Sequence, residues 1–154
     1  MTAPEYRFAH RWAVPAPVGV VYDVLADLAG YPAWWPQVRA VARIDDARAR
    51  VLCRAALPYT LDLVLTSVRE DRAAGVLEAR LEGDLDGWSR WTLAPGAGGA
   101  DLAYEQVVTT PGSVLSAAAR LARPVLILNH AQMMRAGRRG LVRTAAARTG
   151  RTSR

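Results

Sequence analysis

Residues 84–110 read DLDGWSRWTLAPGAGGADLAYEQVVTT, two alternating stretches on either side of a turn rich in glycine. Successive side chains of a strand point to opposite faces, so every second residue shares a face. Residues 95–99 supply the proline and glycines that are typical of a turn. The stretch therefore predicts an antiparallel hairpin. Its predicted inner face consists of Leu85, Gly87, Ser89, Trp91, Leu93, Leu102, Tyr104, Gln106 and Val108.

The same alternation recurs upstream of the hairpin, at the even spacing of an antiparallel meander. The six strands predicted for this meander cover residues 37–45, 48–57, 59–69, 75–82, 84–93 and 100–110. A further strand over 6–14 precedes two short helical segments, 18–28 and 31–35. After the meander, Ser113 is a suitable N-cap for a long helix, which Pro124 should kink.

This order of elements predicts an α+β fold. In it a curved seven-stranded antiparallel sheet wraps around a long C-terminal helix, with two short helices after the first strand. The chain has 154 residues, a length that fits one domain. We expect a single domain over residues 1–145, followed by a flexible, arginine-rich tail over residues 146–154.

Many predicted inward residues are small, on the strands and on the facing helix. They are Ala40, Ala42, Ala55, Ala79, Gly87, Ser89, Ala119, Ala122 and Gly137. Because protein interiors are close-packed, small side chains on both walls predict a cavity between sheet and helix. The alternative is a closer approach of helix and sheet with no cavity. Alternation places no Asp, Glu or Arg on an inward face.

The inward polar residues are hydroxyls, amides and histidines, a set typical of pockets for small organic molecules. We expect the ligand-binding residues to be His10, Trp34, Trp35, Ser89, Trp91, Gln106, Asn129 and Met133. His130 faces the cavity from the helix and is a candidate for proton transfer near neutral pH. Each of these residues also has a structural alternative. His10 could be a hydrogen-bonded wall residue, Asn129 and His130 could anchor the helix to the sheet, and the two tryptophans could fill the core behind the first helix.

Composition limits the partners and cofactors that we expect. Cys53 is the single cysteine and no Cys/His cluster has metal-ligand spacing, so we expect no disulfide, no metal and no cofactor. No apolar stretch predicts an integral membrane segment, and the expected location is the cytoplasm. All 20 basic residues are Arg, and residues 106–154 hold nine of them without a carboxylate. This asymmetry favours a solvated helix face over nucleic-acid binding, and it leaves a peripheral membrane contact open.

Three motifs resemble one known family. They are VPAPVGVVYDVLADLAGYPAWWP at residues 14–36, GWSRWTL at 87–93, and Asn129-His130 followed by Met134, Gly137 and Leu141. Over residues 5–145 the chain resembles the helix-grip fold of the START/SRPBCC superfamily, and in particular its polyketide cyclase/dehydrase-like members from high-GC actinobacteria. The resemblance implies a polyketide- or lipid-like ligand in an internal pocket. If cyclisation and dehydration occur, His130 with Tyr59 or Tyr104 supplies the acid and base.

The sequence leaves three functions open. The first is a non-catalytic carrier or sensor of a hydrophobic metabolite. The second is a cyclase- or dehydratase-like enzyme. The third is a membrane-surface or partner-binding module that uses the arginine-rich C-terminal region. Neither the oligomeric state nor the identity of the ligand follows from the residues.

Overall fold

The computed structural model describes residues 4–54, 60–111 and 113–152, and for residues 113–122 it describes the helical backbone alone. Seven strands form one antiparallel sheet in the order β1-β7-β6-β5-β4-β3-β2. The strands are β1 (Glu5–Val14), β2 (Val38–Arg43), β3 (Arg48–Cys53), β4 (Leu61–Asp71), β5 (Val76–Gly83), β6 (Asp86–Gly96) and β7 (Gly99–Thr109). The predicted sheet and its meander are confirmed.

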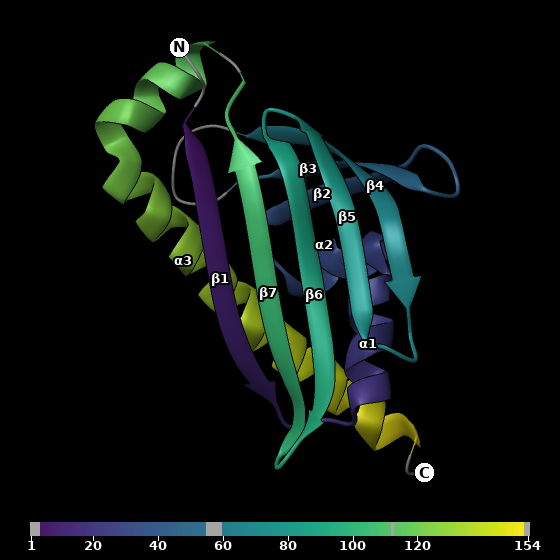
Figure 1. The fold of residues 1–154 in the computed structure, drawn as a ribbon. Coiled ribbons are helices and arrows are strands. Elements are labelled where there is room, and N and C mark those ends of the chain that lie inside the picture. The colour runs from purple at the N-terminus through teal and green to yellow at the C-terminus, as the bar shows by residue number, and fades with distance from the viewer. Residues whose placement is uncertain (1–3, 55–59, 112, 153–154) are drawn as a thin grey trace.

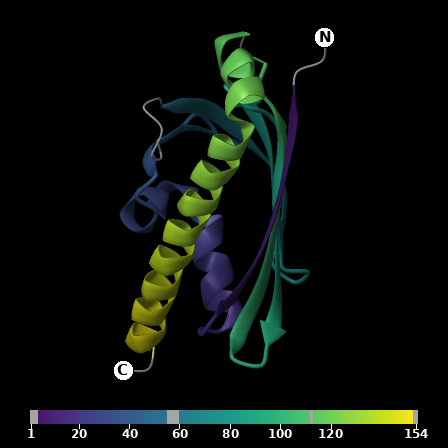
Figure 2. The same ribbon diagram turned by 90° about the vertical axis from the view of Figure 1, so that its left-hand side faces the viewer.

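The helices are α1 (Val18–Ala26), the short 3-10 helix η1 (Leu28–Gly30), α2 (Tyr31–Trp34) and α3 (Ser113–Thr152). Figure 1 shows the sheet curving around α3, with α1 and α2 on the same side of the sheet as α3. In Figure 1 the first turns of α3, drawn in green, run in a different direction from the rest of the helix. Pro124 lies inside α3, and proline is a common cause of such a kink. Figure 2 shows α3 running the length of the molecule, and it views the helix from a side that no other element covers.

The long helix continues further than the sequence predicted. It runs through Thr152, whereas the pattern placed the end of the domain at residue 145. Ala145 is fully buried, and Thr149 donates a hydrogen bond to the Ala145 carbonyl oxygen at 2.8 Å. Packing at residue 145 thus supports helical structure in residues 146–152. Flexibility of this segment remains a prediction.

The inner face of the predicted hairpin is confirmed, because Trp91, Leu93, Leu102, Tyr104 and Gln106 are all buried. Strand β7 pairs with both β1 and β6 along their full lengths. This three-stranded part of the sheet forms one wall of the core.

The predicted inner face of β2 is wrong beyond Val38, which is buried. Ala40 and Ala42 were expected inside, but both are exposed, and Val41 is half-buried instead. The register of β2 against β3 shifts between Val38 and Ala40. A bulge of this kind inserts one residue, so every later side chain changes face. Alternation alone cannot reveal where such an insertion falls.

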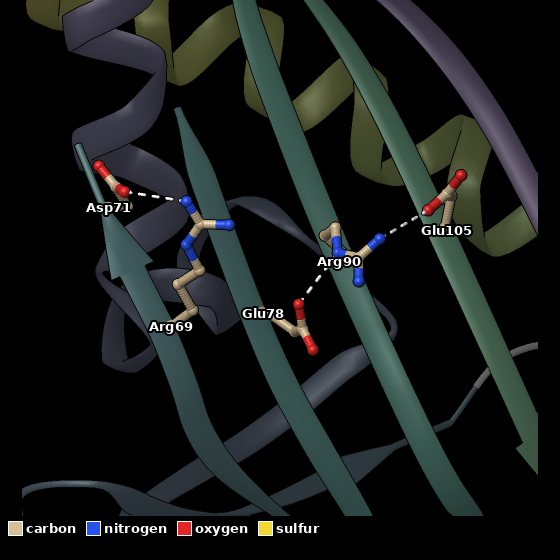
Figure 3. Close-up of polar contacts among 5 residues, drawn as sticks. All are labelled: Arg69, Asp71, Glu78, Arg90 and Glu105. Atoms are coloured by element: carbon tan, nitrogen blue, oxygen red, sulfur yellow. Dashed lines mark hydrogen bonds and ion pairs between the residues drawn. The ribbon is translucent and has the colours of Figure 1, made fainter. Parts of the chain in front are cut away.

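The outer face of the sheet is held by charged side chains. Arg90 on β6 lies between Glu78 on β5, at 3.0 Å, and Glu105 on β7, at 3.4 Å. Arg69 pairs with Asp71 at the end of β4, at 3.0 Å. Figure 3 shows the Arg90 contacts across neighbouring strands and the Arg69–Asp71 contact within β4. Arg90 therefore points away from the core, as its place in the alternation predicts.

Two tryptophans of the α2 segment pack directly against the backbone of α3. A methyl group added at Gly137 would lie 2.5 Å from Trp35 Cε2, and one added at Gly140 would lie 1.7 Å from the Trp34 carbonyl oxygen. Trp35 Nε1 donates a hydrogen bond to the Met133 carbonyl oxygen at 2.9 Å. Gly137 was predicted to leave free space, but its place is filled by an indole ring. At this position the alternative holds, in which the helix packs closely and leaves no cavity.

Candidate functional site

A cavity of about 430 Å³ lies between the sheet and the helices. The predicted cavity is present, with an apolar wall to which β3, β4, β5 and β6 contribute. The wall residues that these strands supply include Val51, Cys53, Leu61, Leu63, Leu65, Leu77, Ala79, Leu81, Ser89 and Trp91. A cavity of this size and composition suits a small organic molecule.

Charged residues surround the open end of the cavity. They belong to the segment after α1, the β2–β3 hairpin and the end of β4: Asp27, Arg43, Asp45, Asp46, Arg48, Arg69 and Glu70. These seven are exposed to solvent, and Glu78 of β5, which is half-buried and paired with Arg90, also lines the cavity. The expectation that no charged residue lines the pocket is therefore wrong at its mouth. The β2 bulge places Arg43 on the inward face of the sheet. A second register shift, in β4, brings Glu70 opposite Leu77, which faces inward.

The hairpin arginines at the mouth are already paired. Arg48 bonds Asp45 at 2.8 Å, and Arg43 bonds Asp46. Hydrogen bonds from the Arg48 side chain and from the Ala47 amide hold the pKa of Asp45 below its usual value. The mouth thus offers a ligand few free positive charges.

The polar part of the cavity wall is a small network centred on Gln106. Tyr104 donates its hydroxyl proton to Gln106 Oε1 at 2.5 Å. Ser89 on the neighbouring strand is the register partner of Gln106 and lines the same cavity. His130 Nε2 lies 3.4 Å from the same Gln106 oxygen. Tyr104 from β7 and His130 from α3 therefore converge on one amide oxygen.

This network is electrically neutral. Burial raises the pKa of Tyr104, which keeps its phenol protonated. Burial, with a smaller contribution from His10, lowers the pKa of His130 to about 3. Burial also raises the pKa of the Cys53 thiol to about 11. Near pH 7 none of these three wall residues is charged.

His130 retains one unused hydrogen-bonding atom. Because Gln106 Oε1 is an acceptor, the contact is favourable when His130 carries its proton on Nε2. Its Nδ1 is then an acceptor, and it is buried without a hydrogen-bond partner. An unsatisfied buried polar atom costs free energy, so a ligand donor or a water that reaches Nδ1 would be stabilised there.

Aromatic rings fix the orientation of His130. Phe8 stacks on its ring at a centroid distance of 3.7 Å, and the His10 ring lies 5.4 Å away. The Trp91 ring lies 4.5 Å from that of Tyr104. Phe8 was not among the predicted site residues, although the β1 alternation already placed it on the inward face.

The structure brings most of the predicted site residues to the cavity. The ones that line it are Trp35, Ser89, Trp91, Tyr104, Gln106, His130 and Met133. His10 contacts His130 but does not line the cavity, and Trp34 is buried against Gly140. Asn129 is half-buried next to His130 and is also absent from the lining. Tyr59 lies outside the described residues. The lining residues that sequence analysis missed include Leu25, Leu28, Tyr31 and Met134.

The depressed pKa of His130 predicts a pH-dependent stability. In the unfolded chain the imidazole takes a proton near pH 6.5, whereas in the folded protein it stays neutral down to about pH 3. The stabilisation is therefore complete above pH 6.5 and is lost as the pH falls towards 3, by roughly 1.4 kcal/mol per pH unit. Urea unfolding at pH 6.5 and pH 4.5 measures this loss. His130→Gln should show a smaller loss than wild type, and an equal loss would contradict the assignment.

Within the described part of the chain, no helix has the length and apolar character needed to cross a membrane. Comparison with curated proteins found no match. Among solved structures, TTHA0849 from Thermus thermophilus is similar with a TM-score of 0.78 and 18% identity, covering 95% of this chain and 99% of its own. The Zhui aromatase/cyclase from Streptomyces sp. R1128 gives a TM-score of 0.76 at 18% identity, covering 94% and 96%.

A third solved structure, Ara h 8.0201, gives a TM-score of 0.63 at 12% identity, covering 90% of this chain and 99% of its own. At these identities the likeness shows a shared fold, the helix-grip arrangement. A family model described as polyketide cyclase / dehydrase and lipid transport matches residues 14–138. The chain therefore belongs to the polyketide cyclase/dehydrase and lipid transport family, within the SRPBCC superfamily that its motifs resemble.

Proposed function

We propose that this protein binds a small, uncharged, largely apolar molecule in the cavity between sheet and α3. The observation behind this proposal is the neutral wall: the cavity measures about 430 Å³, and its inner polar groups are Ser89, Tyr104, Gln106 and His130. Polyketide-like and lipid-like molecules both fit this description. The family membership and the structural similarity to an aromatase/cyclase agree with it.

The Gln106 network is proposed to hold the polar end of the ligand. The Tyr104 hydroxyl and His130 Nε2 are already directed at Gln106 Oε1. The groups left for a ligand are the amide hydrogens of Gln106, the Ser89 oxygen and His130 Nδ1. A hydroxyl or carbonyl group can pair with these atoms. A carboxylate would be buried without a counter-ion, which costs several kcal/mol.

A matched pair of fluorescent probes tests the requirement for a neutral ligand. N-phenyl-1-naphthylamine is neutral, and 8-anilinonaphthalene-1-sulfonate is the same ring system with a sulfonate. We expect the neutral probe to bind at least about tenfold more tightly, because each described arginine that lines the cavity is already paired with a carboxylate. Fluorescence titration at pH 7 measures both dissociation constants. Tighter binding of the sulfonate would refute the neutral-ligand proposal.

Binding without turnover is the function that the site supports best, and the protein would then be a carrier or sensor. A histidine whose pKa is about 3 is a weak base, and at pH 7 it is a neutral imidazole rather than the imidazolium that acts as a general acid. No arginine among the described inner-wall residues is placed to stabilise an enolate, since Arg54 and Arg90 lie outside the cavity lining.

Cyclisation or dehydration of a polyketide-type substrate is the second candidate, and the unpaired Nδ1 of His130 favours it. That atom is an available proton acceptor, and Tyr104, which shares Gln106 with His130, stays protonated. An enzyme should lose turnover of a poly-β-ketone substrate in His130→Gln while it still binds the neutral probe. Unchanged turnover in this variant would remove His130 from the mechanism.

A further inference from the structure

Six of the seven described arginines of α3, all but Arg151, fall into two sets of three, and the first set attaches the helix to the rest of the molecule. The Arg123 guanidinium lies 4.9 Å from the centre of the Tyr6 ring. Arg138 donates a hydrogen bond to the Ala13 carbonyl oxygen at 3.3 Å, and Arg148 lies 3.9 Å from the Asp27 carboxylate. These three side chains contact β1 and the segment after α1. Their positive charges hold α3 against these segments.

The second set points away from the molecule. Arg135, Arg139 and Arg143 are exposed and follow one another at four-residue intervals, so they stack along one stripe of the helix. Within the part of the chain that the structure describes, none of the three forms an ion pair. The sequence from residue 106 to the C-terminus has no carboxylate that could neutralise them. Like charges at this spacing destabilise a helix, and an external anion would relieve their repulsion.

Apolar side chains continue the same stripe towards the start of the helix. Val125, Leu128, Gln132 and Arg135 follow at intervals of three and four residues, which places them on one face. Val125 is 48% exposed and Leu128 is 66% exposed. Large aliphatic side chains at this exposure gain free energy when a partner covers them.

We propose that this stripe, from Val125 to Arg143, docks on the anionic surface of a lipid bilayer. Val125 and Leu128 would enter the interface between head groups and acyl chains, and the three arginines would contact lipid phosphates. The stripe spans about 18 residue steps, or about 27 Å along a straight helix axis, and its arginines have no fixed partners among the described residues. A long row of unneutralised charge beside aliphatic groups matches a laterally uniform anionic surface better than the localised carboxylates of an acidic protein.

Vesicle co-sedimentation of the full chain tests this proposal. The probes are vesicles of pure phosphatidylcholine and vesicles that also contain phosphatidylglycerol. We expect wild type to bind the anionic vesicles at low salt and to be released at high salt, because exposed charges are screened. Each arginine near an anionic surface contributes about a factor of five. Replacing Arg135, Arg139 and Arg143 with Gln should thus weaken binding on the order of 100-fold.

The matched control replaces Arg7, Arg11 and Arg80 with Gln, which removes the same net charge from exposed positions on the sheet. It should lose only a few-fold in vesicle affinity. Leu128→Ser should weaken binding several-fold without loss of folding, because its side chain is exposed. If wild type fails to sediment with anionic vesicles, or if the control triple variant loses as much as the α3 variant, the membrane proposal is overturned. Neither outcome depends on a ligand in the cavity.

Discussion

Gly140→Ala should lower the free energy of unfolding by about 3 kcal/mol, the largest effect that we expect from a single methyl group in this chain. The added carbon would lie 1.7 Å from the Trp34 carbonyl oxygen, which belongs to the backbone of α2 and cannot rotate away. Either α2 or α3 must therefore move. Because Trp35 lines the cavity and bonds the Met133 carbonyl oxygen, such a movement would also disturb the cavity wall.

Gly150→Ala is the matched control for this change. Gly150 lies in the same helix, and a methyl group added there meets no atom within 4 Å. Alanine is the better helix former, so this variant should be unchanged or more stable by up to about 1 kcal/mol. Urea denaturation of both variants measures the difference. If Gly140→Ala proved as stable as wild type, the close contact between α2 and α3 would be disproved.

Ala79→Trp should abolish most of the binding of a neutral apolar probe. Ala79 lines the cavity of about 430 Å³ and pairs with Ser67 and Ser89 on the neighbouring strands, so an indole at this position would project into the space available to the probe. We expect the dissociation constant for N-phenyl-1-naphthylamine to rise more than about tenfold, since the ligand loses the apolar contacts that the indole takes over. Fluorescence titration measures this constant.

Ala94→Trp places the same side chain at an exposed position of β6. It should leave probe binding unchanged. Ala79→Leu serves as an intermediate step and should weaken binding by less than the tryptophan does. Wild-type affinity in Ala79→Trp, with circular dichroism showing an intact fold, would mean that the probe binds elsewhere.

The sheet could be predicted from the sequence because alternation is a local property. Residues 85–93 and 102–108 show the inward positions without any knowledge of their partners, and Ser89, Tyr104 and Gln106 follow directly. His130 could be placed on the inner face of α3 by helical spacing. These residues supply the polar network that the structure brings together.

Other features depend on contacts that a linear pattern does not show. The bulge after Val38 reversed the face of β2, because one inserted residue is invisible to a period of two. Gly137 was interpreted as free space, although small residues serve equally well for close packing of an indole. The charged mouth arises where three separate segments meet, and only the fold brings them to one rim.

The central claim is that the cavity between the sheet and α3 is the ligand site, and tryptophan indole N–H signals in an NMR titration test it directly. Trp35 and Trp91 line the cavity, whereas Trp88 lies on the outer face with Arg90, 4.9 Å from its ring centre. On addition of N-phenyl-1-naphthylamine, the indole signals of Trp35 and Trp91 should shift and that of Trp88 should stay in place. A shift confined to Trp88, with Trp91 unmoved at saturating probe, would contradict the account.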